Sequence, residues 1–309
     1  MKEFIKIYND SSTWFKILIC SAIILCVVFT FKPSSNTVEN FETSKNFEIK
    51  LNEQIYDGFY ANIYDQLVFN NIRTEYEIGQ IINSTTPTNE SMILDIGCGT
   101  GHHEHGFNER GYNNIVGIDK SKEMIKKAQE NYPGYTFQVA DIMKDAGFPF
   151  NNGTFTHILC IYFTIYYIQD KQKFFNKCFK LLKPGGYLVV HLVDRNRFDP
   201  ILPPGNPFYM LSPQNYTTDR ITSTKLDFNG FEYSANFDLD KSNNIAKFEE
   251  KFKDKTNGKV RVNEHKLYME TLTSILQYSQ DAGFIIHAKI DMMKCAYDYQ
   301  YLYVFYKPA

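Results

Sequence analysis

Apolar-rich runs of five to seven residues alternate with amphipathic segments through the middle of the chain. Such continuous runs are typical of parallel strands buried on both faces, and the amphipathic segments repeat their apolar positions every three or four residues, as helices do. This alternation predicts an α/β fold with a doubly wound, mostly parallel sheet. The five predicted strands are residues 92–96, 114–118, 135–139, 155–161 and 187–193.

Helices are expected before, between and after these strands. Ser121 is a good N-cap for one of them, and Gly or Pro ends most of the others. Two further apolar runs near the C-terminus predict an antiparallel pair that completes a seven-stranded sheet. The expected helices are residues 51–83, 102–110, 122–131, 170–182 and 270–282, and the last two strands are residues 284–290 and 299–306.

Residues 194–268 interrupt this rhythm. Five prolines between Pro200 and Pro213 predict a loop. Residues 222–262 then alternate polar and apolar side chains, with turn signals such as Asn229-Gly230 between the runs. This pattern predicts a small antiparallel sheet inserted before the last helix.

The N-terminal segment has a different pattern. Residues 17–31 carry no charge, and Lys16 and Lys32 bracket them. With the preceding aromatic residues, about 18 residues are available, which is near the lower limit for crossing a bilayer core. We therefore expect residues 1–32 to form a single-pass membrane anchor with Trp14 at the interface. A buried helix and a cleaved signal peptide are the alternatives, although no small-residue cleavage site follows.

Residues 33–50 are rich in Ser, Asn, Thr and Lys, and predict a flexible tether to a domain at residues 51–309. Lysines are divided too evenly around the apolar run to fix its orientation. The six cysteines contain no C-x-x-C pair and fit a reducing compartment, so we expect the domain to face the cytosol.

Charge and histidine spacing exclude two classes of function. The formal net charge of −2 gives no electrostatic attraction to nucleic acid. His102, His103 and His105 form a cluster, but their spacing and their place at a helix start favour a solvated first turn. We therefore expect no metal site.

The sequence Asp95-Ile96-Gly97-Cys98-Gly99-Thr100-Gly101 directly follows the first predicted strand. Glycine accepts a left-handed backbone and leaves no Cβ in the way of a ligand. Ligands of open α/β sheets bind at the carboxyl ends of the strands. The spacing is G-x-G-x-G, whereas a dinucleotide fingerprint needs G-x-G-x-x-G. Taken alone, these residues also suit a turn that binds nothing.

Further features follow in a fixed order. Asp119 ends the second predicted strand, Asp141 ends the third, and Lys183-Pro184-Gly185-Gly186 precedes the fifth. Together with the glycine turn, this set resembles class I S-adenosylmethionine-dependent methyltransferases, most nearly their small-molecule type 11 group, over about residues 50–309. The resemblance implies a Rossmann-like methyltransferase fold and S-adenosylmethionine as the cofactor.

The resemblance also implies a role for each residue. The glycine turn would lie against the carboxypropyl end of the cofactor. Asp119 would accept both ribose hydroxyls, and Asp141 the adenine amine, with Ile142 packed on the ring. Asp95 would orient the turn or meet the cofactor's ammonium through water. The implied cofactor-binding set is Asp95, Gly97, Gly99, Gly101, Asp119, Lys120, Asp141, Ile142, Ile161 and Tyr162.

Methyl transfer is an in-line displacement that needs alignment and the exclusion of water. A general base is needed only where the nucleophile carries a proton. The candidate bases are His191 and Asp194 at the end of the fifth predicted strand, and His265 in the insertion; a core or capping role is the alternative for His191. We expect the aromatic face of residues 51–83 and the insertion at 194–268 to form the acceptor pocket.

These features predict methyl transfer to a small-molecule or lipid-like acceptor by a membrane-anchored enzyme. The N-P-P-Y-type tetrapeptide of amino-group DNA and protein methylases is absent after the fourth predicted strand, where Ile161-Tyr162-Phe163-Thr164 stands, so no nucleic-acid partner is expected. The alternatives are a nicotinamide-dependent oxidoreductase and a methyltransferase-like scaffold without turnover. Modification of a protein at the membrane also stays open.

Overall fold

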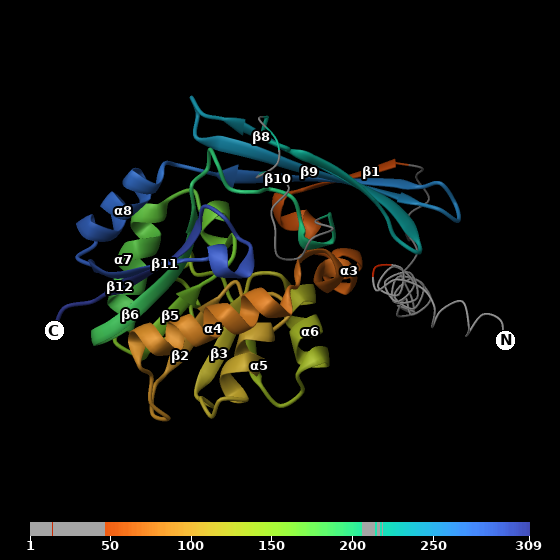
Figure 1. Cartoon of the computed structure of the whole chain (residues 1–309). Helices are drawn as coiled ribbons and strands as arrows, with labels where there is room; N and C mark the ends of the chain where they lie inside the picture. The colour runs from red at the N-terminus through yellow and green to blue at the C-terminus, as the bar shows by residue number, and fades with distance from the viewer. Residues whose placement is uncertain (1–13, 15–46, 206–213, 215–216, 218) are drawn as a thin grey trace. The chain divides into compact units, whose positions relative to one another are not determined.

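The computed structural model describes Trp14, residues 47–205, Gln214, Thr217 and residues 219–309. The chain divides into two compact units, Met1–Val38 and Glu39–Ala309, and both sheets described below belong to the second (Figure 1). No helix among the described residues is long and apolar enough to cross a bilayer. The anchor expected at residues 1–32 lies outside the described residues except for Trp14.

A seven-stranded sheet in the order β11-β12-β6-β5-β2-β3-β4 forms the centre of the second unit. Strands β2 to β6 run parallel, while β12 is antiparallel to both of its neighbours. The predicted sheet is therefore confirmed, and its strand order reverses between β5 and β2. The bounds are β2 Ile93–Ile96, β3 Ile115–Asp119, β4 Thr136–Val139, β5 Phe155–Cys160, β6 Leu182–Val193, β11 Ile285–Asp291 and β12 Gln300–Tyr306.

Helices cover both faces of this sheet because alternate strand residues point to opposite sides. On β5, Ile158 and Cys160 lie in one apolar cluster with residues of α7 and α8, whereas Leu159 lies in another with residues of α4 and α5. Helix α6 packs on β3 and β4, next to α3. The bounds are α3 Gly58–Val68, α4 Asn71–Thr85, α5 His102–Asn108, α6 Lys122–Asn131, α7 Lys171–Leu181 and α8 Leu272–Asp281.

The predicted single helix at residues 51–83 is wrong. The chain forms a 3₁₀ turn η1 (Asn52–Ile55) and then two separate helices, α3 and α4. Asp57 starts α3 by accepting a hydrogen bond from the Tyr60 N–H, and Asn70 starts α4 by accepting one from the Arg73 N–H. The apolar spacing continues through both helices and hides these two N-caps.

A second sheet, in the order β1-β10-β9-β8-β7, confirms the antiparallel sheet predicted within residues 194–268. In Figure 1 it lies above the central sheet. Its bounds are β1 Phe47–Leu51, β7 Ser223–Asp227, β8 Phe231–Asp240, β9 Ile245–Asp254 and β10 Val260–Tyr268.

The predicted tether at residues 33–50 is wrong at its C-terminal end, where β1 begins. Residues 47–50 form a parallel strand against β10, with Phe47 opposite Val260. The apolar side chains of β1 are about half exposed, with Phe47 at 51% and Ile49 at 49%. Main-chain pairing with a strand over 200 residues away therefore holds β1, and no local apolar pattern signals it.

Candidate active site

A cavity of about 850 Å³ lies at the carboxyl ends of β2, β3, β4 and β5. This is the place where the strand order of the sheet reverses, and such switch points are where open α/β sheets bind ligands. Residues of η1, α3, α4 and β10 line the opposite wall. The cavity therefore lies between the central sheet and a cover made of the N-terminal helices and the inserted sheet.

The glycine turn after β2 contributes two glycines to the cavity lining, Gly97 and Gly99. All three glycines of the turn have left-handed φ angles, of +73°, +58° and +89°. A Cβ on Gly97 would lie 2.6 Å from the Thr164 side chain. Gly101 does not belong to the described cavity lining, because its Cα packs on Phe137, where a Cβ would approach to 2.7 Å. The expectation that Gly101 faces the cofactor is therefore corrected to a packing role.

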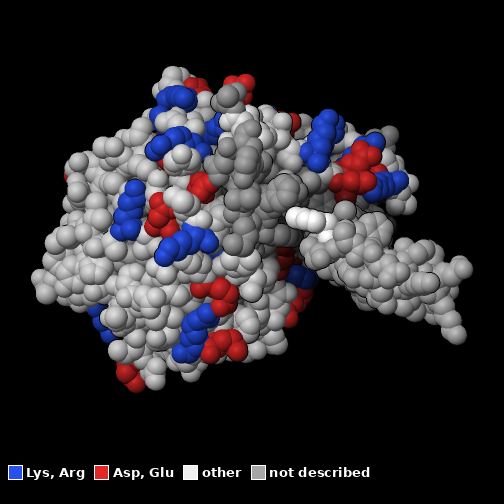
Figure 2. All heavy atoms as spheres, in the orientation of Figure 1, with Lys and Arg blue, Asp and Glu red and all other residues white. Residues whose placement is uncertain are grey.

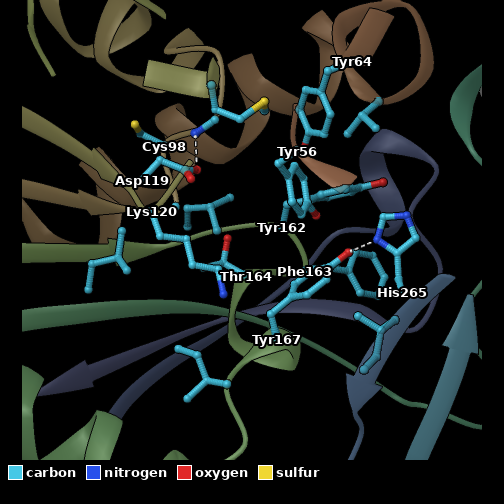
Figure 3. Close-up of a pocket in the computed structure, with 18 of the residues that line it drawn as sticks. Tyr56, Tyr64, Cys98, Asp119, Lys120, Tyr162, Phe163, Thr164, Tyr167 and His265 are labelled. Carbon is cyan, nitrogen blue, oxygen red and sulfur yellow. Dashed lines mark hydrogen bonds between the residues drawn. The ribbon is translucent and has the colours of Figure 1, made fainter. Parts of the chain in front are cut away.

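Asp119 ends β3 beside this turn, and its carboxylate ties the two together. One oxygen accepts a hydrogen bond from the Gly99 N–H at 3.3 Å (Figure 3), and the other accepts one from the Ser121 N–H at 2.8 Å. Burial raises the pKa of Asp119, while these hydrogen bonds oppose the shift. Each oxygen retains acceptor capacity for a ligand hydroxyl.

Asp141, Ile142 and Lys120 line the same end of the cavity, as predicted from their positions after β4 and β3. The Asp141 carboxylate accepts the Met143 N–H at 2.9 Å, which orients it at the strand end. Lys120 forms an ion pair with Glu53 of η1 at 2.7 Å. This pair joins the predicted cofactor end to the cover.

Ile161 and Tyr162 follow β5 and also line the cavity. Tyr162 has a left-handed φ of +55°, a strained conformation for a residue with a side chain. The His191 Nδ1–H donates a hydrogen bond to the Tyr162 carbonyl at 2.5 Å. His191 therefore supports the turn that presents Tyr162.

The structure corrects the expectation that His191 and Asp194 face the cavity as bases. Neither is among the described residues that line it. His191 is 1% exposed, and its Nδ1 is committed to the Tyr162 carbonyl. Asp194 pairs with Arg197 at 2.7 Å and accepts the Asn196 N–H, so it stabilises the turn after β6. The sheet register, which the sequence does not reveal, decides both positions.

Asp95 lies under the glycine turn at 2% exposure, next to Glu104 of α5 at 0%. Burial raises the pKa of Asp95 to about 6. Burial and the charge of Asp95 raise the pKa of Glu104 well above its ordinary value. Glu104 therefore keeps its proton to a higher pH than an exposed glutamate does.

Sequence reasoning missed Arg73 of α4, which is 5% exposed and lines the cavity. Its guanidinium lies 4.3 Å from the Tyr162 ring centroid, and its Nε lies 3.7 Å from Glu77. Helix α5, which follows the glycine turn, spans only seven residues. Its dipole therefore attracts an anionic ligand more weakly than the full charge of Arg73 does. A lone Arg in an amphipathic helix gives little signal in the sequence.

The three clustered histidines have three different partners. His102 lies 3.1 Å from Asp65, His103 lies 3.0 Å from Glu77, and His105 lies 3.3 Å from the Tyr135 hydroxyl. Among the described residues, no group of His, Cys, Asp and Glu has the arrangement of a metal site.

The far end of the cavity is aromatic. Tyr56 follows η1, Tyr60 and Tyr64 come from α3, and Tyr167 comes from the 3₁₀ turn η2 (Thr164–Tyr167) after β5. His265 of β10 faces them, with its Nδ1 2.8 Å from the Tyr167 hydroxyl (Figure 3). Of the three candidate bases, the structure therefore brings only His265 to the cavity.

Comparison with known proteins matches residues 93–186 to a family described as a methyltransferase domain. Over 102 residues the chain is 38% identical to phosphoethanolamine N-methyltransferase 3 of Arabidopsis thaliana, covering 32% of this chain and 20% of that protein. It is 31% identical over 109 residues to a ubiquinone biosynthesis O-methyltransferase of Psychrobacter cryohalolentis, covering 34% and 41%. The chain thus spans about a fifth to two fifths of the length of these relatives.

Solved structures share the fold over a longer stretch. The CcbJ methyltransferase of Streptomyces caelestis superposes with a TM-score of 0.61 at 14% identity, over 82% of this chain and 98% of that one. An S-adenosylmethionine-dependent methyltransferase of Clostridium acetobutylicum gives a TM-score of 0.58 at 17% identity, over 81% and 98%. Residues 93–186 thus match a methyltransferase domain, and the solved structures show that the chain shares the fold of S-adenosylmethionine-dependent methyltransferases.

Proposed function

We propose that the protein transfers a methyl group from S-adenosylmethionine to a small-molecule acceptor. The observation that carries the proposal is a single cavity with two chemically distinct ends. One end holds the glycine turn, Asp119 and Asp141, and the other is walled by tyrosines that follow η1 or belong to α3 and η2. Donor and acceptor bound at these ends would meet within one cavity.

The residues at the first end fit the cofactor. A Cβ on Gly99 would make only ordinary contacts, at 3.6 Å from Met124 and 3.7 Å from Tyr64, so the left-handed φ of +58° is what calls for glycine there. Asp119 would hold the ribose hydroxyls, with Asp141 at the adenine amine. Arg73 is the group that would pair with the cofactor's carboxylate.

When bound, S-adenosylmethionine supplies an activated methyl group on a positively charged sulfur. The work of the chain is to align the acceptor and to exclude water. Tyr56, Tyr64 and Tyr162 line the cavity, and burial raises the pKa of each. The rings therefore stay neutral and present electron-rich faces where the positive charge would lie.

The cavity volume supports a small molecule as the acceptor, since sites for such ligands enclose about 300–1,000 Å³. The relatives named above are a phosphoethanolamine and a ubiquinone-pathway methyltransferase, and a further structural neighbour is a sugar N-methyltransferase. On the face drawn in Figure 2, acidic and basic side chains are interspersed. The described residues on that face therefore form no basic patch of the kind that binds nucleic acid.

The two alternatives differ in what they bind and turn over. An oxidoreductase would bind a nicotinamide cofactor, and the G-x-G-x-G spacing and the family match at residues 93–186 count against it. A scaffold without turnover would bind S-adenosylmethionine and transfer nothing. We also propose that residues 1–32 attach the protein to a membrane, which would bring lipid-like acceptors within reach.

The test is incubation of the full chain with S-adenosylmethionine labelled in the methyl group and a small-molecule and lipid extract of the source cells. We expect label in one acceptor species and release of S-adenosylhomocysteine. Labelled protein instead of labelled small molecule would overturn the acceptor class. Binding of S-adenosylmethionine without any transfer would favour the scaffold.

A further inference from the structure

We propose that Tyr167, His265 and Glu250 form a proton relay that deprotonates the acceptor, and that the acceptor is an amine. The inference rests on the proposed methyl transfer and names its base and its substrate class. The three residues come from η2, β10 and β9, so the inserted sheet supplies two of them.

The hydrogen bonds set the direction of the relay. Glu250 is 0% exposed and His265 is 2% exposed, and His265 Nε2 lies 2.8 Å from a Glu250 oxygen. An ionised carboxylate only accepts, so the proton of the imidazole is on Nε2. Nδ1 is then the acceptor for the Tyr167 hydroxyl at 2.8 Å. The Tyr167 oxygen also interacts with Tyr56 and keeps a second lone pair that can take a proton from a ligand.

Glu250 is held in its ionised form. Tyr233 donates to one of its oxygens at 2.9 Å, and Asn263 donates to the other at 3.2 Å. Burial acts to raise the pKa of Glu250, but the hydrogen bonds from His265, Asn263 and Tyr233 oppose it, and the pKa is lowered overall. A buried carboxylate that keeps its charge stabilises the imidazolium formed when His265 takes up a second proton.

The tyrosines that pack around His265 are neutral. The ring centroids of Tyr56 and Tyr60 lie 6.2 Å and 6.0 Å from the imidazole. Burial raises the pKa of these two tyrosines and of Tyr167 well above the ordinary value. Arg261, two residues before Asn263, is committed to Asp57 through both carboxylate oxygens. Glu250 is therefore the charge that governs His265.

The cavity lining favours a cationic acceptor. The described lining holds seven carboxylates and three cations, and four carboxylates and two lysines remain once Asp95, Asp119, Asp141 and Arg73 are assigned to the cofactor. One of these lysines, Lys120, already pairs with Glu53. Aromatic rings and carboxylates attract an ammonium group, whereas a phosphate would need free cations. The carboxylates are Glu53, Asp65, Asp95, Asp119, Asp141, Asp170 and Asp199, and the cations are Arg73, Lys120 and Lys266.

An alkyl ammonium has a pKa of about 10 and an imidazolium one of about 6.5, so the proton transfer is uphill but within reach of a positioned base. The ammonium gives one proton to the Tyr167 oxygen while the Tyr167 proton moves to His265 Nδ1. The amine lone pair then forms the N–CH₃ bond as the S–CH₃ bond breaks, and sulfur keeps the electron pair. The methylated ammonium leaves, and His265 returns its proton to solvent.

Kinetics test the relay with His265→Asn, Glu250→Gln and Tyr167→Phe in the full chain. The probe is the amine fraction of the extract, retained on a cation exchanger, with methyl-labelled S-adenosylmethionine. We expect about a 100-fold lower rate near pH 7 for His265→Asn and Tyr167→Phe. The deficit should shrink towards pH 10, where the amine is already free. A loss that is equal at all pH values indicates a structural role and overturns the relay.

The matched control is His157→Gln, a second buried histidine (5% exposed) outside the described cavity lining. The methyl-transfer rate of His157→Gln should equal that of the unchanged chain. Calorimetry measures the affinity of each variant for S-adenosylmethionine, and a value within about twofold of the unchanged chain shows that the variant is folded. Product analysis should find N-methylation; an O-methyl product overturns the amine assignment.

Histidine-selective ¹⁵N NMR of the full chain with S-adenosylhomocysteine tests the relay without turnover. We expect the His265 imidazole to carry its proton on Nε2. The variant Tyr167→Phe by itself should change the chemical shift of His265 Nδ1. An Nδ1–H form overturns the relay whatever the rates are. An unchanged chain that transfers nothing overturns the proposed function itself, whereas normal transfer by all three variants overturns the relay alone.

Discussion

Arg73 is a buried cation whose guanidinium lies over the Tyr162 ring and near Glu77. Burial acts to raise the pKa of Glu77, but the charge of Arg73 and the hydrogen bond from His103 lower it overall. Both side chains are therefore charged, and Arg73 has donors left for a ligand carboxylate. In the proposed function, it recognises the amino-acid end of the cofactor.

The variant Arg73→Met should bind S-adenosylmethionine about 10–100-fold more weakly, the usual range for one charge-assisted hydrogen bond. It should bind 5′-methylthioadenosine, which lacks the carboxylate, as the unchanged chain does. Calorimetry with the two ligands on the same sample measures this difference. Equal losses for both ligands would show that Arg73 only supports the fold.

Residues at strand ends could be placed from the sequence, because a strand end is a local feature. Asp119, Asp141 and the glycine turn lie at the predicted edge of the sheet for this reason. His191 was misplaced because its direction depends on how β6 pairs with β5 and β12. Arg73 was missed because it meets Tyr162 only through tertiary packing.

Between elements, one ion pair joins the start of α3 to the inserted sheet. Arg261 of β10 is 2% exposed and donates to both oxygens of Asp57, at 2.9 and 2.8 Å, and to the Ile55 carbonyl. Asp57 also caps α3 by accepting the Tyr60 N–H. The aromatic wall of the cavity is therefore fixed by a contact more than 200 residues apart in the chain.

Asp57→Ala should lower the free energy of unfolding by about 3–5 kcal/mol, because it leaves the Arg261 charge buried without its partner. Asp170→Ala is the matched control, since Asp170 caps α7 through the Lys173 N–H. Loss of a cap alone costs about 1 kcal/mol. Urea unfolding compares the two; equal losses would mean that the ion pair adds nothing beyond the cap.

Helix α5 meets the sheet through Glu104, whose pKa is raised by burial and by Asp95. Between the ordinary pKa of about 4.5 and the raised one, the native state binds more protons than the unfolded chain, so stability falls as pH rises. The variant Glu104→Gln has no ionisable group at this position and so avoids this loss of stability. For each pH unit in that window, the melting temperature of the variant should rise by about 3–5 °C relative to that of the unchanged chain.

Thermal unfolding between pH 5 and pH 9 measures this gain. Glu109→Gln is the control, because Glu109 is exposed just after α5. Parallel melting curves for Glu104→Gln and the unchanged chain would contradict the buried acid pair.

At the scale of the whole chain, strand and helix alternation was enough to predict the seven-stranded sheet and the inserted antiparallel sheet. Strand β1 was not predicted, because its pairing with β10 depends on the folded insertion and its side chains lack a buried apolar face. The two N-caps that divide residues 51–83 were hidden by continuous helical spacing. Long-range pairing and local capping thus account for the main differences.

The proposed anchor makes a separate prediction. The full chain should sediment with lipid vesicles, and a chain that lacks residues 1–32 should stay in the supernatant with its S-adenosylmethionine affinity unchanged. Equal partitioning of both chains would contradict the anchor and leave the catalytic proposal intact.

The most direct test of the central claim is calorimetric titration of the full chain with S-adenosylmethionine and, separately, with NADH and NADPH. The account predicts micromolar binding of S-adenosylmethionine alone, about 100-fold weaker in Asp119→Ala because two charge-assisted hydrogen bonds to the ribose are lost. Asp145→Asn, a change in an exposed carboxylate paired with Lys177, should bind normally. A folded chain that does not bind S-adenosylmethionine, or that binds a nicotinamide cofactor instead, would contradict the account.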